Sequence, residues 1–189
     1  MSDTRKKLIE TTKELLWERG YDAMSPNQVL DYSGVGKGSL YHHFKGKKTL
    51  AQAAISDRSD ELIREFDVDF AAELPLMQRF SSYLCKDREG LKGCRLGRLV
   101  SDISITADEL RQPIAQLFQH IETAFALALK EGVDRQEFEL RGNAEEIAAV
   151  LVAAIQGAFI LSRAHTDPSY MTKIGKGTMQ LLQASILFK

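Results

Sequence analysis

The sequence contains little cysteine and little proline, and it has no very long apolar run. Of its 189 residues, two are cysteine and four are proline. Two cysteines do not make a disulfide framework, and the chain shows no secretory leader pattern, so we expect a cytoplasmic protein with reduced thiols. The longest apolar run, Ile147–Leu161, contains a glutamine. It is shorter than the roughly 20 residues that a bilayer requires, so we expect no membrane partner.

Motifs of common enzyme chemistry are also missing. The chain has no glycine-rich phosphate loop and no G-x-S-x-G sequence. His120 and His165 stand apart from other residues that could form a nucleophile–base pair or a metal site. We therefore expect a protein that is not an enzyme and that holds no cofactor and no metal.

The composition is that of a globular protein with an uneven charge distribution. Hydrophobic residues make up 44% of the chain and charged residues 27%, with a net charge of −1. Residues 1–50 carry nine Lys or Arg and six Asp or Glu, so they sum to +3, whereas the remainder sums to −4. A basic N-terminal part on an acidic body indicates that the two parts meet different partners.

The pattern of apolar residues predicts an all-α protein of about nine helices. No strand run, internal repeat or low-complexity linker is evident. We expect a helix-turn-helix DNA-binding domain at 1–48 and an effector-binding and dimerisation domain at 49–189. The expected helices are 3–20, 26–33, 37–44, 49–66, 76–87, 96–105, 113–130, 144–163 and 170–187. Three of their ends are assigned from single residues: Pro113 near a start, Gly132 at an end, and Asn143 as an N-cap.

The segment SPNQVLDYSGVGKGSLYHHF, residues 25–44, predicts two short helices joined at a tight turn. Five apolar side chains would form its small core: Val29, Leu30, Val35, Leu40 and Phe44. Five others would lie on the outer surface of the second helix: Lys37, Ser39, Tyr41, His42 and His43. A short helix with hydrogen-bond donors on its outer face fits the major groove of DNA, which is about 12 Å wide. Lys47, Lys48 and Ser25 would be placed to contact phosphate.

Other interpretations of these residues remain open when each is taken alone. Tyr41 could be a core aromatic, and the lysines could form a solvated face. His42 and His43 could be a metal pair, although adjacent helical residues point about 100° apart, whereas ligand pairs prefer i, i+4 spacing. The combination of all these residues favours DNA binding.

The segments TRKKLIETTKELLWERGYDAMS and GVGKGSLYHHFKGKKTL resemble the DNA-binding domain of TetR/AcrR-family transcriptional regulators, over about residues 3–55. The resemblance implies base or backbone contacts from Lys37, Gly38, Ser39, Tyr41 and His42. It places His43 and Lys47 near the sugar-phosphate backbone, and Ser25 as a cap and phosphate contact. The chain departs from the family at Gly36, where Ser or Thr is usual, and at Leu30, where Ala is usual.

The C-terminal helices are the predicted dimer interface. Residues 144–163 are apolar nearly all round, so a partner chain could cover the side that the core leaves open. Gly157, Gly175 and Gly177 would allow close backbone approach. The family resemblance implies that the last two helices pair into a four-helix bundle between subunits. A core helix in a monomer is the alternative.

Cys94 lies in the sequence GCRLGRLVSDIS, which resembles a segment of a TetR subgroup that includes electrophile-sensing repressors. Arg163 falls where a basic residue is expected in such sensors, Asp102 stands near the position of a usual Glu, and Arg95 and Arg98 would add positive charge. A nearby cation stabilises a thiolate, so Cys94 is a candidate reactive thiol. The alternative is a small buried residue at a helix start.

Large side chains on the middle helices are the candidate lining of an effector pocket. They are Tyr83, Leu99, Phe118, Phe125, Gln156 and Phe159. The predicted function is a repressor that binds a palindromic DNA operator as a dimer, and releases it when a small-molecule effector of unknown identity binds or modifies the body. Two alternatives remain: a hydrophobic ligand with no thiol chemistry, or an adaptor that binds protein.

Overall fold

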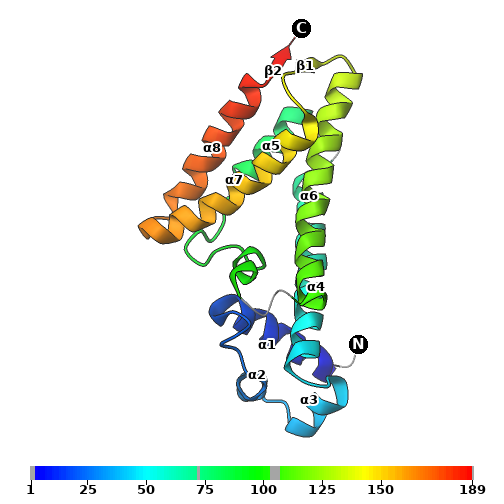
Figure 1. The fold of residues 1–189 in the computed structure, drawn as a ribbon, viewed down its shortest axis with the longest axis vertical. Helices are drawn as coiled ribbons and strands as arrows, with labels where there is room; N and C mark the ends of the chain where they lie inside the picture. The colour runs from blue at the N-terminus through cyan, green and yellow to red at the C-terminus, as the bar shows by residue number, and fades with distance from the viewer. Residues whose placement is uncertain (1–2, 72, 103–106, 189) are drawn as a thin grey trace. The chain divides into compact units, whose positions relative to one another are not determined.

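The computed structural model describes residues 3–71, 73–102 and 107–188, and for Phe188 it describes the backbone only. Its helices are α1 (Asp3–Arg19), α2 (Pro26–Ser33), α3 (Lys37–His43), α4 (Lys47–Asp69), α5 (Leu76–Leu84), α6 (Asp108–Asp134), α7 (Ala144–His165) and α8 (Ser169–Ala184) (Figure 1). A 3₁₀ turn, η1 (Gly97–Ser101), and two short strands, β1 (Phe138–Leu140) and β2 (Ile186–Phe188), complete the described elements. The expected all-α architecture is confirmed.

The chain divides into two compact units. The first comprises residues 1–62 and 95–117, and the second comprises residues 63–94 and 118–189. Helices α4 and α6 each contribute to both units. This is a division by packing, and the expected functional boundary between residues 48 and 49 remains a prediction.

In the first unit, α1 packs against both α2 and α3. Its buried side chains include Leu8, Leu15 and Leu16. Burial of several such side chains, each worth about 1.5–3 kcal/mol, holds the short helices α2 and α3, which are too short to be stable alone. The first unit therefore contains a three-helix scaffold of α1, α2 and α3, together with the first parts of α4 and α6.

In the second unit, α7 and α8 lie side by side, and α8 also packs against α5 (Figure 1). Gly175 of α8 makes this close approach possible, because a Cβ there would lie 2.3 Å from the carbonyl oxygen of Leu84. Asn143 caps α7 as expected, since its side chain accepts a hydrogen bond from the amide of Glu146 at 3.0 Å.

Several expected helix ends are wrong. Helix α6 begins five residues before Pro113, because Asp108 and Glu109 suit the positive end of a helix. It also continues through Gly132, which serves packing: a Cβ there would lie 2.3 Å from the ring of Phe138. Helix α5 ends at Leu84 instead of Asp87.

The expected helix 96–105 is also wrong, because its described part forms only the 3₁₀ turn η1. Residues 103–106 lie outside the described residues. The absence of strands is contradicted as well. Helix α8 stops at Ala184, and residues 186–188 pair antiparallel with residues 138–140. Two three-residue strands are too short to produce an alternating pattern in the sequence.

Helix α7 is longer than the apolar run from which the expectation was drawn. With 22 residues, it is long and apolar enough to cross a membrane by length and composition. Only a third of its most apolar window is buried. The core helix of a soluble protein passes the same test, so this observation alone decides nothing.

Candidate nucleic-acid interface and effector region

Helix α2 begins at a reciprocal cap. The hydroxyl of Ser25 accepts a hydrogen bond from the amide of Gln28 at 3.3 Å, and the side chain of Gln28 accepts one from the amide of Ser25 at 2.9 Å. Pro26 occupies the first helical turn, where its missing N–H costs nothing. The sequence predicted the Ser25 cap but not the contribution of Gln28, although the S-x-x-Q spacing signals it.

Helix α3 presents a polar surface because only one side of it is buried. Leu40 and Phe44 are buried, as expected, and so is Val29 of α2, whereas Leu30 and Val35 are only half-buried. The side chains left at the surface are Lys37, Ser39, Tyr41 and His42, with Gly38 among them and His43 half-buried. Tyr41 is 50% exposed, so it is not a core aromatic.

Gly38 leaves the start of α3 unobstructed. A Cβ built on it would meet no atom within 4 Å. Gly36 is the N-cap of α3 and provides no side-chain hydrogen bond, as its sequence indicated. The open backbone at Gly38 therefore provides a surface that another molecule can approach closely.

Lys47 is held at the turn between α1 and α2. Its ammonium lies 4.5 Å from the centre of the Tyr21 ring and donates a hydrogen bond to the carbonyl of Asp22 at 3.2 Å. Burial raises the pKa of the Tyr21 hydroxyl, so the ring stays neutral beside the cation. Lys48, by contrast, pairs with Glu109 at 3.0 Å.

A buried lysine that the sequence analysis missed joins α1 to the first part of α4. The ammonium of Lys13 lies 2.6–2.8 Å from carboxylates of Glu10, Asp57 and Glu61. These three acids are, within residues 3–71, 73–102 and 107–188, the one group that could hold a metal ion, and Lys13 already supplies a cation there. Its place four residues after Ile9 and three before Leu16, on the apolar side of the helix, was the available signal.

Residues 95–102 contact the end of α1. The Arg95 guanidinium lies 3.6 Å from the centre of the Trp17 ring and pairs with Glu14 at 2.9 Å. Arg98 donates a hydrogen bond to the carbonyl of Trp17. Both arginines therefore contact α1, and the expectation that they add charge beside Cys94 remains a prediction.

Two glycines bring the loop before Cys94 onto α7. A Cβ on Gly90 would lie 2.9 Å from the hydroxyl of Ser162, and one on Gly93 would lie 3.5 Å from Nη1 of Arg163. Gly93 also has a positive φ of 86°, which disfavours any side chain. Arg163 thus lies against the residue next to Cys94, which is itself half-buried.

Two of the predicted pocket residues lie in one aromatic cluster. Tyr83 and Phe125 meet with ring centres 5.6 Å apart, in a cluster with Phe66, Phe70 and Phe80. Burial raises the pKa of the Tyr83 hydroxyl; Arg88 partly offsets this rise and Cys94 adds to it. Phe118, Gln156 and Phe159 are half-buried, and Leu99 is buried in η1, within the first unit.

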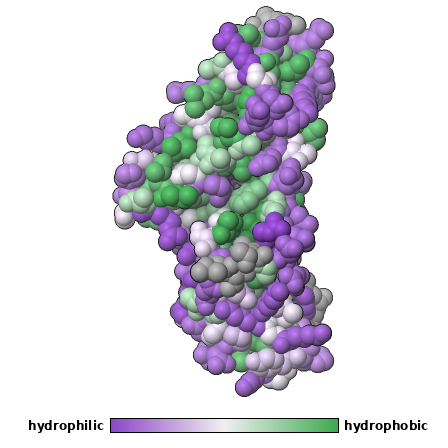
Figure 2. Space-filling view, in the orientation of Figure 1, coloured by the Kyte–Doolittle hydropathy of each residue, from purple (hydrophilic) through white to green (hydrophobic). Residues whose placement is uncertain are grey.

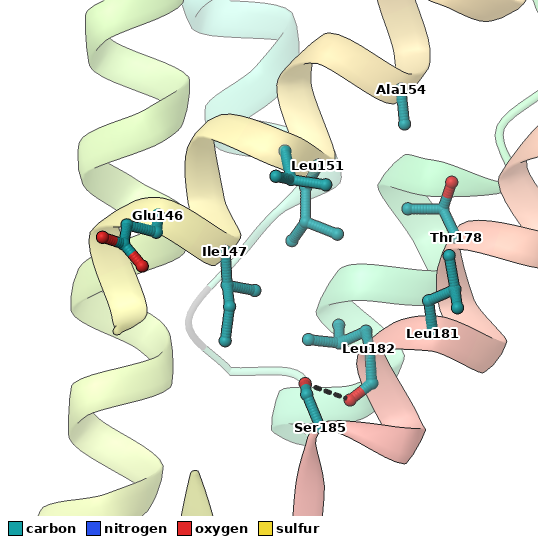
Figure 3. A pocket seen from close by; sticks show the side chains of 9 residues that line it. Glu146, Ile147, Leu151, Ala154, Thr178, Leu181, Leu182 and Ser185 are labelled. Carbon is teal, nitrogen blue, oxygen red and sulfur yellow. Dashed lines mark hydrogen bonds between the residues drawn. The ribbon is translucent and has the colours of Figure 1, made fainter. Parts of the chain in front are cut away.

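The apolar cavity on α7 and α8 involves other residues. It has a volume of about 240 Å³ and is lined by Ile147, Leu151 and Ala154 of α7 and by Leu181 and Leu182 of α8 (Figure 3). Hydrophobic surface is also visible over these two helices in Figure 2. A second cavity of about 320 Å³ is polar and lies beside Pro75, Arg79 and Glu131.

Two family models match the chain. Residues 8–54 match the model for bacterial regulatory proteins of the tetR family, and residues 76–177 match the model for the C-terminal domain of LmrA/YxaF-like transcriptional regulators. The second match alone spans more than half of the chain.

Curated relatives and solved structures agree with these matches. The uncharacterized HTH-type transcriptional regulator YxaF of Bacillus subtilis is 28% identical over 92% of both chains. The HTH-type transcriptional repressor NemR of Escherichia coli is 24% identical over 82% of both. The crystal structure of its reduced form has a TM-score of 0.84 at 20% identity and covers 98% of both chains. A TetR transcriptional regulator from Chloroflexus aurantiacus has a TM-score of 0.86 at 21% identity, covering 99% of this chain and 98% of that one.

Proposed function

This chain belongs to the tetR family of bacterial regulatory proteins, and we propose that it is a repressor that binds a palindromic operator as a homodimer. The members of this family are transcriptional regulators and not enzymes. In the proposal the protein acts in the cytoplasm, and an effector that binds or modifies the second unit releases it from DNA. The name of one relative, the repressor NemR, supports the repressing role.

The exposed surface of α3 is the observation that carries this proposal. Lys37, Ser39, Tyr41 and His42 offer donors to base edges or to the DNA backbone, and Gly38 lets the helix approach closely. His43, Lys47 and Ser25 contact the sugar-phosphate backbone. A single short helix reads only a few base pairs, so specificity requires a second copy on a second half-site.

The dimer forms, in this proposal, through α7 and α8. Val150 is 62% exposed and Leu181 is 73% exposed, and both line the apolar cavity of Figure 3. A Cβ on Gly157 or Gly177 would meet no atom within 4 Å, so these positions leave room for another backbone. Exposed apolar side chains around such a cavity favour coverage by a second copy of the same surface.

For the effector, we propose a thiol-reactive electrophile that modifies Cys94. The position of Arg163 against Gly93 supports this, because it places a positive charge beside the loop that carries Cys94, and the anionic thiolate is the species that reacts with electrophiles. The effector pocket in this proposal also involves Tyr83, Phe118, Phe125, Gln156 and Phe159. A small hydrophobic ligand that binds among these aromatic side chains, without thiol chemistry, is the second candidate.

The test of the proposed function is selection of double-stranded DNA from a random-sequence library, followed by salt titration of binding. We expect an enriched palindrome and an affinity that falls steeply with salt. N-ethylmaleimide should release the wild type and leave Cys94→Ser bound. Equal release of both proteins would show that Cys94 is not the thiol that senses the electrophile. Failure to enrich any sequence would contradict operator binding, and protein capture experiments would then test the adaptor function.

A further inference from the structure

The turn between α1 and α2 is held by a residue 81 positions away. The amide of Tyr21 donates a hydrogen bond to the carboxylate of Asp102 at 2.5 Å. Gly20, the preceding residue, has a φ of 82°, and a Cβ there would lie 2.8 Å from Oδ2 of Asp102. Glycine is therefore required at position 20 both by its backbone conformation and by the carboxylate against it. All three residues belong to the first unit.

The same turn holds Lys47. The ring of Tyr21 lies under the Lys47 ammonium, and the carbonyl of Asp22 accepts its hydrogen bond. Asp102 fixes the backbone from which both of these groups project. If the amide of Tyr21 lost its acceptor, the turn would lose the contact that sets the height and direction of the Tyr21 ring.

We propose that Asp102 is a positioning residue for operator binding, acting through Tyr21 on Lys47. This inference rests on the proposed function, in which Lys47 contacts a DNA phosphate. Asp102 touches no DNA and serves to hold the α1–α2 turn, so that Lys47 is presented in one place. Asp102 directly follows residues 95–101, which contact α1. A displacement of those residues would therefore move Asp102 and, through Tyr21, the phosphate contact of Lys47.

The direction in which DNA affinity changes when Asp102 is replaced distinguishes a positioning role from simple charge repulsion between Asp102 and DNA. Asp102 is an acid, and removal of a negative charge from a DNA-binding unit ordinarily strengthens DNA binding. Positioning predicts the opposite. Asp102→Ala should bind the selected DNA about tenfold more weakly. The slope of log binding constant against log salt concentration should also become shallower by about 0.9, the contribution of one phosphate contact.

Three variants give the controls. Asp108→Ala makes the same charge change in the first unit at an exposed acid that pairs with Arg111, and it should bind as tightly as wild type or more tightly. Asp102→Asn keeps an acceptor oxygen for the Tyr21 amide and should retain most of the affinity. In a Lys47→Ala background, Asp102→Ala should cost less than twofold, because the contact that it positions is already gone.

The inference is overturned if Asp102→Ala binds as tightly as Asp108→Ala, or if its loss is the same with and without Lys47. If Asp102→Ala unfolds too easily for binding measurements, Tyr21→Leu tests the same route. It removes the ring beneath Lys47, and it should give the same loss and the same lack of additivity with Lys47→Ala. Fully additive losses would contradict the proposal. If the wild type selects no DNA, the proposed operator function fails as well. If the wild type binds DNA and the variants do not behave as expected, only the inference about Asp102 fails.

Discussion

The ammonium of Lys13 lies 2.7 Å from a carboxylate oxygen of Asp57, although 44 residues separate them. The Lys13 side chain is 1% exposed, while its three acidic partners keep some contact with solvent. The cluster fixes α1 against the first part of α4. Since α1 also supports α2 and α3, Lys13 is part of what orients the DNA-binding helix.

Lys13→Met should destabilise the protein by about 3 kcal/mol, because it leaves three carboxylates close together without their cation. This is the low end of the expected range, since the acids are partly exposed. Urea unfolding measures the difference in the free energy of unfolding. Lys7→Met is the matched control: Lys7 pairs with Asp3 at 3.2 Å on the surface, so its loss should cost under about 1 kcal/mol. Equal effects of the two changes would contradict the stabilising role of the cluster.

The Lys13 cluster also predicts a dependence on pH. Burial lowers the pKa of Lys13, but hydrogen bonds from it to Asp57, Glu10 and Glu61 outweigh burial, so its pKa is raised above the ordinary value. A raised pKa in the folded state means that the contribution is complete below the pKa of unfolded lysine, about 10.4, and is lost as the pH rises through the folded value. The stability difference between wild type and Lys13→Met should therefore be constant from about pH 7 to 9 and shrink above about pH 10.4. A difference that grows with pH would have the wrong sign.

Gly38 gives a size series at the proposed DNA surface. The Cβ that alanine or leucine adds at position 38 meets no atom within 4 Å, and either should keep or raise stability, since glycine is unfavourable inside a helix by about 1 kcal/mol. If α3 lies in the major groove, operator affinity should fall with each increase in size. Ala115→Leu, at an exposed position of α6, adds bulk elsewhere in the first unit and should leave affinity unchanged. Full binding by Gly38→Leu would place the DNA elsewhere.

Leu181→Glu should break the dimer through α7 and α8. The charge would fall on the rim of the apolar cavity, where burial against a second copy costs several kcal/mol. Analytical ultracentrifugation should show a monomer, and operator binding should weaken by more than about tenfold. Leu127→Glu is the matched control, because Leu127 is also well exposed, at 60%, but lies on α6. A dimer in both variants, or a monomer in both, would contradict the assigned surface.

Arg163→Gln tests the environment of Cys94. In a Cys85→Ser background, alkylation by N-ethylmaleimide should slow by about three- to tenfold, because the variant lacks the positive charge that lies beside the loop carrying Cys94. Arg141→Gln removes an exposed arginine from the segment between β1 and α7 and should leave the rate unchanged. The rate is followed by mass spectrometry of the intact protein. An unchanged rate in Arg163→Gln would show that the arginine does not act on this thiol.

The DNA-binding helices were predictable from sequence because local signals define them. Ser25 and Pro26 mark the start of α2, Gly34 adopts the left-handed conformation that ends it, and the observed bounds agree within a residue. Residues 96–105 had helical composition, but those that the structure describes form only a 3₁₀ turn. Here Arg95 and Arg98 contact α1, and Asp102 accepts a hydrogen bond from the turn that follows α1. Contacts between residues about 80 positions apart leave no periodic signal in the chain.

Gly132 shows the opposite error. Glycine commonly ends a helix, and the sequence offered no reason to place it inside one, since the close approach of Phe138 depends on the strand pair at the far end of the chain. Lys13 was missed for a similar reason: its three partners come from two helices, and only their packing makes a lysine suitable for burial.

The measurement that tests the central claim most directly is binding to the selected palindrome after five base pairs are inserted between its half-sites. The insertion turns one half-site by about half a helical turn, to the opposite face of the DNA. A homodimer with two α3 helices should lose nearly all preference for this DNA over a random sequence, while ten inserted base pairs should restore part of it. Unchanged affinity after the five-base-pair insertion would contradict the account, because it would show that each chain reads DNA alone.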